Sequence, residues 1–366
     1  MSRLDRRLAV GAVSLALLLA GAAGLVSAGE RMASVAVFPV ENLSGGSIPA
    51  DEIRQFLTNS LATGGISVLG DRALEEFMTR HRVRYTAGID AATAEKLRRE
   101  TGVDGVVIAS VELSNDAVPP KVAVVVRLVS VRAAPAVVWA DDAGLSGDDA
   151  PGFFELGVVS DYQALLTRAL ERLAGSLLGY LKTGEAGAGP RRASKFRPKS
   201  AFRSPAIEAG KTYTVAVLPF VNLSERRNAG EILALLFTRH LSAVPRFRVV
   251  DTGVVRRQLL DARIIMDGGP SLSDAETLAS LIDADLVLGG RVLRYEDYEG
   301  PAGRTRVEFS AVLVDRKSRR VVWSSDSYNE GSDGVGVFER GTSRTAHAMA
   351  TQMVGITADM IAGLGR

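Results

Sequence analysis

Apolar and polar residues follow one another along the chain in an order that occurs twice. In each half a short apolar strand, over residues 35–40 or 215–220, contains a proline near its end and leads into an Asn-Leu-Ser turn. Proline cannot donate to a β-ladder, so it is expected at the end or the edge of a strand. The next segment has helical spacing, because its apolar residues share one face. These residues are Ile53, Phe56, Leu57 and Leu61 in the first half, and Ile232, Leu235 and Leu236 in the second.

The remaining elements also correspond between the halves. A second strand, two polar helical segments, a third strand and a hairpin follow in the same order. In the first half they span 66–69, 72–82, 90–100, 105–113 and 122–139, and in the second 247–250, 252–262, 272–282, 286–293 and 307–323. The pattern predicts an α/β fold in which each half is a small mixed-sheet domain with flanking helices, in the order β-α-β-α-α-β-β-β-α.

The first strands of the two hairpins differ in pattern. Residues 122–131 are apolar on both faces, which is expected for a strand that is covered on both sides. Residues 307–314 alternate between apolar and polar, which predicts one buried face and one face in water.

Each half closes with an amphipathic helix. Its apolar residues are spaced by three or four positions, as in a stripe along one helical face. The stripes are Leu166, Leu170, Leu173, Leu177 and Leu181, and then Met349, Met353, Ile356, Met360 and Leu364. We expect this face to pack on the domain's own sheet. A seam for a partner helix is the alternative, although the stripe is short for a coiled coil.

The correspondence extends to individual segments, such as Val137-Val-Trp139 with Val321-Val-Trp323 and Phe154-Glu155 with Phe338-Glu339. We therefore interpret the chain as a tandem duplication, with a first domain over 33–183 and a second over 213–366.

The segment between the copies, 184–212, differs in composition. It opens with a Gly-, Ala- and Pro-rich stretch typical of a flexible linker. Six cations follow with no acidic residue among them, namely Arg191, Arg192, Lys195, Arg197, Lys199 and Arg203. They are candidate contacts for anionic lipid headgroups, which attract basic segments. A solvated linker without such contacts is the favoured interpretation, because basic linkers are common.

The beginning of the chain predicts export. Arg3, Arg6 and Arg7 precede an apolar run over residues 8–28 that ends in small residues, as in a cleavable signal peptide over 1–28. The mature protein is then expected in the periplasm or at the outer membrane. An uncleaved anchor in the inner membrane is the alternative, because the run could just span a bilayer.

Composition removes several kinds of chemistry. The chain has no cysteine, which excludes disulfides, thiolate metal sites and a lipid-modified cysteine. The formal net charge is +2, so nothing global indicates nucleic acid. His81, His240 and His347 have no metal-ligand spacing and are expected on helix faces or the surface. The acidic stretch that contains Asp141, Asp142, Asp148 and Asp149 is expected to be a solvated loop.

The search for catalytic motifs finds no nucleophile elbow, P-loop or dinucleotide fingerprint, so we expect no enzyme, cofactor or metal site. Aromatic residues are the candidate partner contacts, since they dominate interface energetics. Trp139 and Trp323 recur at one point of each copy, where we expect a core position, and either is a candidate partner contact if it is exposed. Tyr295 and Tyr298 lie in polar loops of the second copy.

The strand Val-Ala-Val-Leu-Pro-Phe-Val-Asn-Leu-Ser, the later Asp-Ala-Asp-Leu-Val-Leu-Gly-Gly segment and the hairpin ending in Val-Val-Trp-Ser resemble the amino-terminal domain of TolB and the periplasmic domain of curli-secretion (CsgG-like) lipoproteins. The second copy carries the resemblance better. It implies a compact domain that makes protein–protein contacts in the cell envelope without catalysis. Curli-secretion proteins are lipid-anchored and form channels, whereas this chain lacks the cysteine to lipidate.

The sequence therefore predicts a non-enzymatic scaffold or assembly factor of the envelope, with envelope proteins as partners and homo-oligomerisation left open. A regulator that docks onto a peptidoglycan synthase or a secretion channel is the alternative, and an unrecognised enzyme is the third hypothesis.

Overall fold

The computed structural model describes residues 32–149, 158–185, 196–208, 210–264, 272–297, 304–333 and 343–364. The predicted signal peptide, the first half of the predicted linker, the Phe-Glu pairs at 154–155 and 338–339, and Tyr298 lie outside these ranges.

The elements of the first half follow the order expected from the sequence, with one additional short strand. They are β1 (Ser34–Val37), β2 (Glu41–Asn42), α2 (Ala50–Thr63), β3 (Ser67–Val68), α3 (Asp71–Arg80), α4 (Ala91–Thr101), β4 (Gly105–Asn115), β5 (Lys121–Ser130), β6 (Ala136–Ser146) and α5 (Tyr162–Thr183).

The second half repeats this order element by element. It consists of β8 (Tyr213–Val217), β9 (Val221–Asn222), α6 (Ala229–Ser242), β10 (Phe247–Val250), α7 (Thr252–Asp261), α8 (Leu272–Ile282), β11 (Leu286–Glu296), β12 (Arg306–Asp315), β13 (Arg320–Glu330) and α9 (Ala346–Ile361).

Local geometry repeats as well. In the Asn-Leu-Ser turns, the side-chain amide of Asn42 donates to the carbonyl of Gly46 at 2.7 Å, and that of Asn222 donates to the carbonyl of Arg226 at 2.7 Å. The side-chain oxygen of each asparagine accepts from the backbone N–H of the serine two residues later. Asparagine closes such turns because its short side chain reaches its own backbone two residues on.

The strands of both copies join in one mixed sheet. Its order is β3-β1-β4-β5-β6-β10-β8-β11-β12-β13-β7. In each copy the first strands pair in parallel and the last three form an antiparallel meander. The edge strand β6 of the first copy pairs antiparallel with β10, the edge strand of the second, so each of these edges covers the other.

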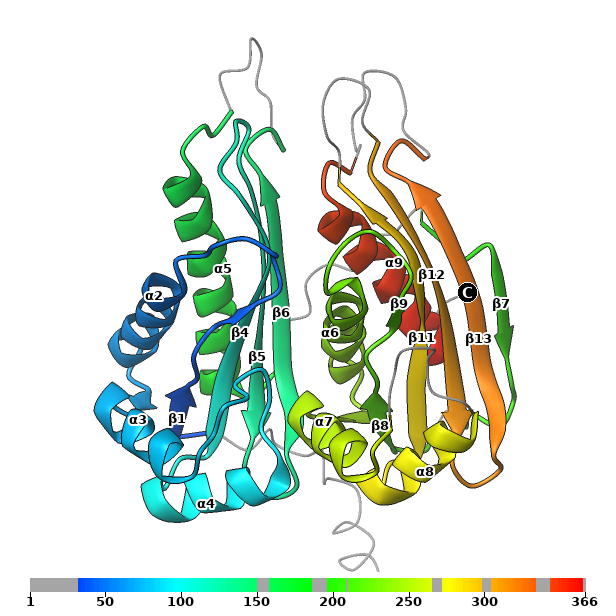
Figure 1. The fold of residues 1–366 in the computed structure, drawn as a ribbon, viewed down its shortest axis with the longest axis horizontal. Coiled ribbons are helices and arrows are strands. Elements are labelled where there is room, and N and C mark those ends of the chain that lie inside the picture. The colour runs from blue at the N-terminus through cyan, green and yellow to red at the C-terminus, as the bar shows by residue number, and fades with distance from the viewer. Residues whose placement is uncertain are drawn as a thin grey trace, which may run out of the picture.

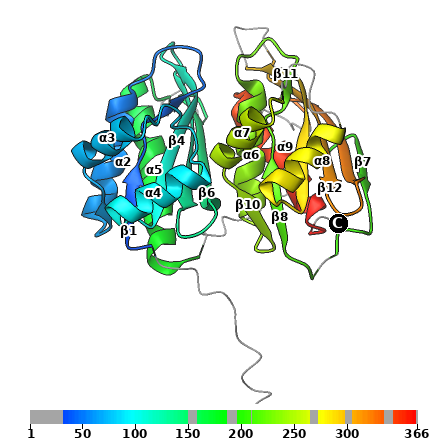
Figure 2. The same cartoon turned by 60° about the horizontal axis from the view of Figure 1, so that its bottom comes forward.

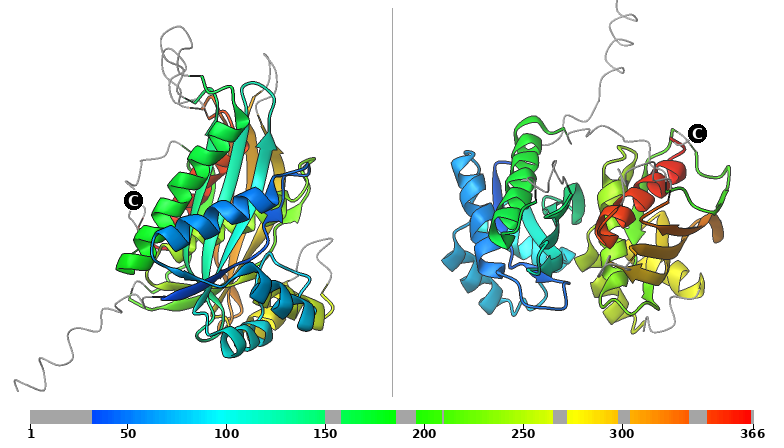
Figure 3. Two further views of the ribbon diagram at one scale, coloured as in Figure 1. Left: turned by 90° about the vertical axis from the view of Figure 1, so that its left-hand side faces the viewer. Right: turned by 90° about the horizontal axis from the view of Figure 1, so that it is seen from above.

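The helices form layers between and beside the strands. α2 and α5 cover one face of the first copy's strands, and α6 and α9 cover the equivalent face of the second copy's strands (Figure 1). Seen from above, α6 and α9 lie between the two sets of strands (Figure 3, right). The shorter pairs, α3 with α4 and α7 with α8, pack on the opposite face at one end of each copy (Figure 2).

This layering explains the difference between the two hairpins. All but the last residue of β5 are buried, because α6 covers the face that α5 leaves free. In β12, Val307, Phe309, Ala311 and Leu313 are buried and the residues between them are partly exposed. The expectation of one strand covered on both sides and one covered on a single side is confirmed.

The closing helices pack on their own sheets as expected. Leu170, Leu173 and Leu177 of α5 and Met349 and Met353 of α9 are buried in the cores of their copies. The second stripe ends earlier than its spacing indicates, because α9 ends at Ile361 and Leu364 is 51% exposed.

The structure differs from the expectation of a flexible linker over residues 196–208. Ser200–Arg203 forms the strand β7, which pairs with β13 and covers that edge of the sheet. Phe196 and Ile207, on either side of β7, are buried in the core of the second copy. These two apolar side chains fix the segment to the second copy. The cations and glycines of the predicted linker indicated a solvated segment instead.

Candidate functional site

Several buried charged side chains lie where the two copies meet. We call this contact the junction; it comprises the β6–β10 strand pair, a corner around Asp251, and a cluster of charges beneath α6 and α9. The strand pair aligns Val249 with Val137 and Val250 with Ala136. The ladder continues through the N–H of Asp251, which donates to the carbonyl of Pro135 at 3.1 Å.

At the corner, Asp251 caps α7 and holds the first copy at the same time. One carboxylate oxygen accepts from the N–H of Gly253 at 2.9 Å and from the N–H of Ile89, in the first copy, at 2.7 Å. The other oxygen lies 3.6 Å from Nε of Arg127 on β5. Both charged side chains are buried, at 0% and 1% exposure. An ion pair in such surroundings stabilises only while both partners are present.

Two glycines permit the close approach at this corner. A Cβ on Gly88 would lie 2.4 Å from the backbone nitrogen of Gly253, and a Cβ on Gly253 would lie 2.2 Å from that of Ile89. Any side chain at either position would therefore push the copies apart. Arg127 also donates to the carbonyl of Ala87, so the loop before α4 is held by the same guanidinium.

The charge cluster centres on His347 of α9. Its Nδ1 contacts the carboxylate of Glu112 on β4, and its Nε2 lies 3.0 Å from Asp142 on β6. Gly144 makes room for the ring, since a Cβ there would come 2.3 Å from the imidazole. All three polar side chains are buried.

Burial opposes the protonation of His347, but the charges and hydrogen bonds of Glu112 and Asp142 outweigh it and raise the pKa of His347 to about 10. Burial would likewise raise the pKa of Asp142, yet Arg239 and His347 hold it well below its ordinary value. Burial raises the pKa of Glu112. The cluster therefore contains a histidinium between two carboxyl groups, of which Asp142 is firmly ionised.

Arginines of the second copy complete the cluster. Arg239 of α6 reaches Asp141 at 3.0 Å and Asp142 at 2.7 Å. Arg226, just before α6, donates to the carbonyl of Ser44 at 2.8 Å and to that of Glu112. Arg239 thus neutralises carboxylates of the first copy, whereas Arg226 binds backbone carbonyls of that copy.

An apolar contact lies beside these charges. Leu43, from the first Asn-Leu-Ser turn, is 5% exposed and belongs to the core of the second copy. The expectations for these polar segments are corrected accordingly. His240 and His347 lie on helix faces, as one of the two expectations had it, but His347 is buried and His240 is half-buried. Asp142 lies on a covered strand instead of in a solvated loop. Tertiary packing of the second copy on the first removes them from water.

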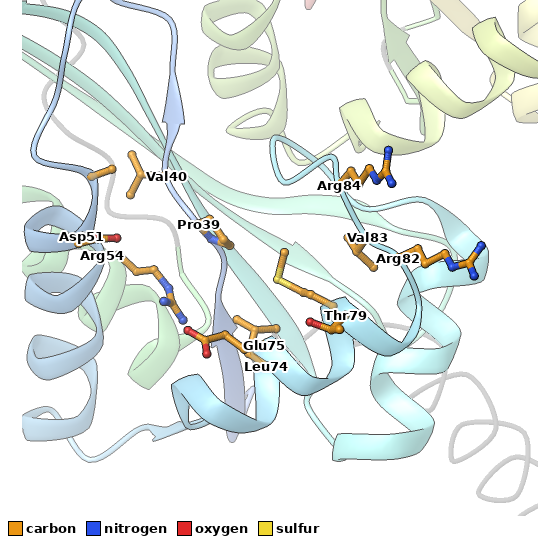
Figure 4. Close-up of a pocket in the computed structure, with 12 residues that line it drawn as sticks. Pro39, Val40, Asp51, Arg54, Leu74, Glu75, Thr79, Arg82, Val83 and Arg84 are labelled. Carbon is orange, nitrogen blue, oxygen red and sulfur yellow. The ribbon is translucent and has the colours of Figure 1, made fainter.

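A separate groove lies on the first copy, with a volume of about 630 Å³, between the end of β1, the start of α2 and α3. Figure 4 shows Arg54 and Glu75 directed into it, while Arg82 and Arg84 point away. Arg54 is already engaged, since it donates to the carbonyl of Val37 at 3.0 Å and to Asp71 at 2.6 Å. The groove thus lacks the set of convergent, unpaired polar groups typical of a ligand site.

The predicted aromatic contacts are mostly buried. Trp139, Trp323 and Tyr295 are 3%, 1% and 5% exposed, so these rings fill the cores and cannot form a surface hot spot in this structure. Burial also raises the pKa of Tyr295 well above its ordinary value. The fourth candidate, Tyr298, lies outside the described residues.

The predicted basic contacts divide into two groups. Arg191, Arg192 and Lys195 lie outside the described residues. Arg197 and Lys199 are exposed. Arg203 donates to the carbonyls of Ile207 and Ile361, at 3.1 and 3.4 Å, and so helps to hold β7 against α9. The expectation that Arg203 is available for lipid headgroups is corrected, because its guanidinium binds backbone carbonyls.

Two absences concern only the part of the chain that the structure describes. Within it, no group of three or more His, Asp or Glu side chains could hold a metal ion. Within the same ranges, no helix is both long enough and apolar enough to cross a membrane.

Comparisons with known proteins give likenesses to solved structures alone. No protein-family model matches the chain, and no curated protein matches it. A PelC dodecamer structure from Paraburkholderia phytofirmans is similar over 46% of this chain and 96% of its own, at 20% identity and a TM-score of 0.31. Lipoprotein GNA1162 from Neisseria meningitidis is similar over 40% of this chain and 99% of its own, at 22% identity and a TM-score of 0.29.

The LpoB C-terminal domain from Escherichia coli is similar over 33% of this chain and 89% of its own, at 20% identity and a TM-score of 0.27. Identities and TM-scores of this size leave the function of the chain to be argued from its own residues.

Proposed function

We propose that the mature chain is a non-enzymatic scaffold or assembly factor of the cell envelope, located in the periplasm or at the outer membrane, that binds protein partners. One observation carries the proposal. Two ionisable residues with strongly shifted pKa values, His347 and Asp142, are enclosed in the junction between the copies, where they hold two folding units together.

An active site needs such residues at a cavity that a substrate can enter. Here the shifted groups are covered by α6 and α9, and the groove on the first copy contains none of them. Because the shifted ionisable groups and the open groove lie in different places, the structure favours a protein that binds partners through its surface. The location in the envelope rests on the predicted signal peptide and on the resemblance to TolB and curli-secretion domains, which also implies protein contacts without catalysis.

The test of location uses the full chain expressed in its native cell. We expect a mature protein that begins at Gly29 and is recovered with the periplasm or the outer membrane. An uncleaved product in the inner membrane would support the anchored alternative, and a cytoplasmic product would refute export.

The test of a non-enzymatic role uses complementation of a deletion strain. Glu75→Gln removes one of the two exposed carboxyl groups that line the groove, the other being Asp51, and leaves its shape, so a scaffold predicts full complementation by this variant. A folded Glu75→Gln protein that fails to complement would indicate chemistry in the groove and would overturn the proposal. A regulator of a peptidoglycan synthase or a secretion channel is separated from a scaffold by the identity of the crosslinked partner.

A further inference from the structure

The second copy has a sheet face that corresponds to the one buried in the junction. In the first copy, the row Ser110–Val125–Asp142 runs across β4, β5 and β6 beneath α6 and α9. The same registers place Arg291, Ser310 and Asp326 in one row across β11, β12 and β13. Both copies have an irregularity at the same point of the ladder, which displaces Glu112 in the first and Leu293 in the second.

We call this surface of the second copy the free face, defined by Leu223, Arg291, Leu293 and Tyr328 together with the outward side chains of β12. α7 and α8 cover only one end of these strands (Figure 1). Leu223 is 57% exposed, whereas its counterpart Leu43 is 5% exposed in the junction. The backbone places both leucines alike, since each donates its N–H at 2.8 Å to the strand beside it.

Leu293 and Tyr328 add to this apolar surface, at 42% and 40% exposure. Leu293 stands where the first copy has the buried Glu112. At the position of Leu293, the free face is therefore more apolar than the equivalent face of the first copy, which α6 and α9 cover. Exposed apolar side chains gathered on one surface and rimmed by polar groups are typical of protein interaction sites.

The charges of the free face differ from those of the junction. Arg291 replaces Ser110 at the centre, is exposed, and has no side-chain hydrogen bond or ion pair within the described ranges. Tyr328 stands at the position of Gly144, the glycine that makes room for His347. A helix that carries a histidine at the place of His347 does not fit here, and a carboxylate is the group that suits Arg291.

A second copy of this chain is a poor occupant. Its own α6 and α9 are already enclosed, so only α2 and α5 could dock in their place. Ala234 and Thr238, buried in α6, correspond to the exposed Gln55 and Asn59 in α2, a helix of the same length. The strand β7 also covers the edge of β13, where a further copy would have to pair its sheet.

We propose that the free face binds an amphipathic helix of another protein, whose apolar side chains cover Leu223, Leu293 and Tyr328 and whose Asp or Glu pairs with Arg291. The internal junction is the reference for this geometry, because there the equivalent face of the first copy is covered by helices. The proposal rests on the proposed function and names the surface and the partner chemistry that it uses.

The experiment places a photo-crosslinking amino acid at Leu293, and separately at Tyr328, in the full chain in its native cell. The control position is Leu260 on α7, which is 60% exposed and is not one of the residues that define the free face. We expect adducts with one other protein from the two face positions and none from Leu260. Mass spectrometry should map the adducts to a helical segment with an acidic residue within one turn.

Arg291 provides the second arm of the test. Arg291→Glu should lower the yield of the adduct about tenfold or more, and Arg291→Lys should largely retain it, because the contact depends on charge complementarity. The exposed position lets both variants fold, which tryptophan fluorescence checks. An unchanged yield with Arg291→Glu, an adduct between two copies of this chain, an adduct with lipid, or no adduct at all would each overturn the proposal.

Failure of the surface assignment can be distinguished from failure of the proposed function. If a defined envelope protein is captured from Leu260 and not from the free face, the scaffold function stands and the assignment of the surface is wrong. If the protein is found in the cytoplasm, the function itself is wrong.

Discussion

Replacing Asp251 by alanine should separate the two copies energetically. The residue joins three elements, since it caps α7, accepts the N–H of Ile89 from the first copy and pairs with Arg127. Removing the carboxylate leaves Arg127, at 1% exposure, without its nearest counter-ion.

The magnitude follows from these contacts. Breaking one side of a buried ion pair costs about 3–5 kcal/mol, because the remaining charge stays out of water. The carboxyl group of Glu41, which lies close enough to Arg127 for their charges to interact, offsets part of this loss. The helix cap contributes about 1 kcal/mol more. We therefore expect Asp251→Ala to lower the free energy of unfolding by about 3 kcal/mol or more.

The chain itself provides the assay. It contains two tryptophans, one in the core of each copy, so Trp139→Phe and Trp323→Phe leave a single reporter in the second or the first copy. With an intact junction, both reporters should give the same urea midpoint, because the copies share buried surface and unfold together. In the Asp251→Ala background the two midpoints should separate.

Asp90→Ala is the matched control. Asp90 caps α4 through the N–H groups of Ala92 and Thr93, at 3.0 and 3.1 Å, but has no charge partner among the described residues of the second copy. It should cost about 1 kcal/mol and leave the midpoints together. Equal losses for the two variants, or coincident midpoints in Asp251→Ala, would show that the corner does not couple the copies.

Three further predictions follow from the junction and the linker. Gly88→Ala should destabilise the protein by at least about 2 kcal/mol in a urea titration, because its Cβ would lie 2.4 Å from a backbone nitrogen; Gly46→Ala, with open space around it, is the neutral control, and equal effects would contradict the reasoning. The pKa of His347 is about 10 in the fold, above its ordinary value, so its stabilisation is complete below about pH 6.5 and is lost as pH rises towards 10. His347→Gln should remove that alkaline decline, and an unchanged pH profile of unfolding would refute the histidinium. Replacing the five linker cations that precede Arg203 with glutamine should abolish any salt-sensitive binding to anionic vesicles; binding that persists, or that the parent protein never shows, disposes of the lipid contact.

Much of the fold could be predicted because it depends on local patterns. The helical stripe through Ile53, Leu57 and Leu61 and the Asn-Leu-Ser turns need only nearby residues to be explained. The apolar pattern of β5 even indicated that something covers its second face. The pattern could not name the covering element, since any apolar surface would satisfy it.

The junction was harder to find, although it left a trace. Arg127 interrupts an apolar strand and Glu112 follows another apolar run, and a charge within a buried strand indicates a buried partner. The partners, Asp251 and His347, lie more than a hundred positions away along the chain. Helical or strand spacing carries no information about pairs so distant.

The linker illustrates the same division. Its cations and glycines are typical of a solvated segment. That composition gave no indication that Phe196 and Ile207 are buried in the second copy's core. Whether an isolated apolar residue is buried depends on the cavity it meets, and that cavity is formed by other elements.

By itself, the sequence determined most elements of the two halves and the order in which they repeat, because hydrophobic spacing and turn chemistry act over a few residues. Tertiary structure alone decided that the copies share one sheet, that a histidinium and Arg239 pair with carboxyl groups between them, and that one sheet face stays open. The physical reason is that burial and charge pairing depend on which surfaces meet, and those surfaces are brought together only when the whole chain packs.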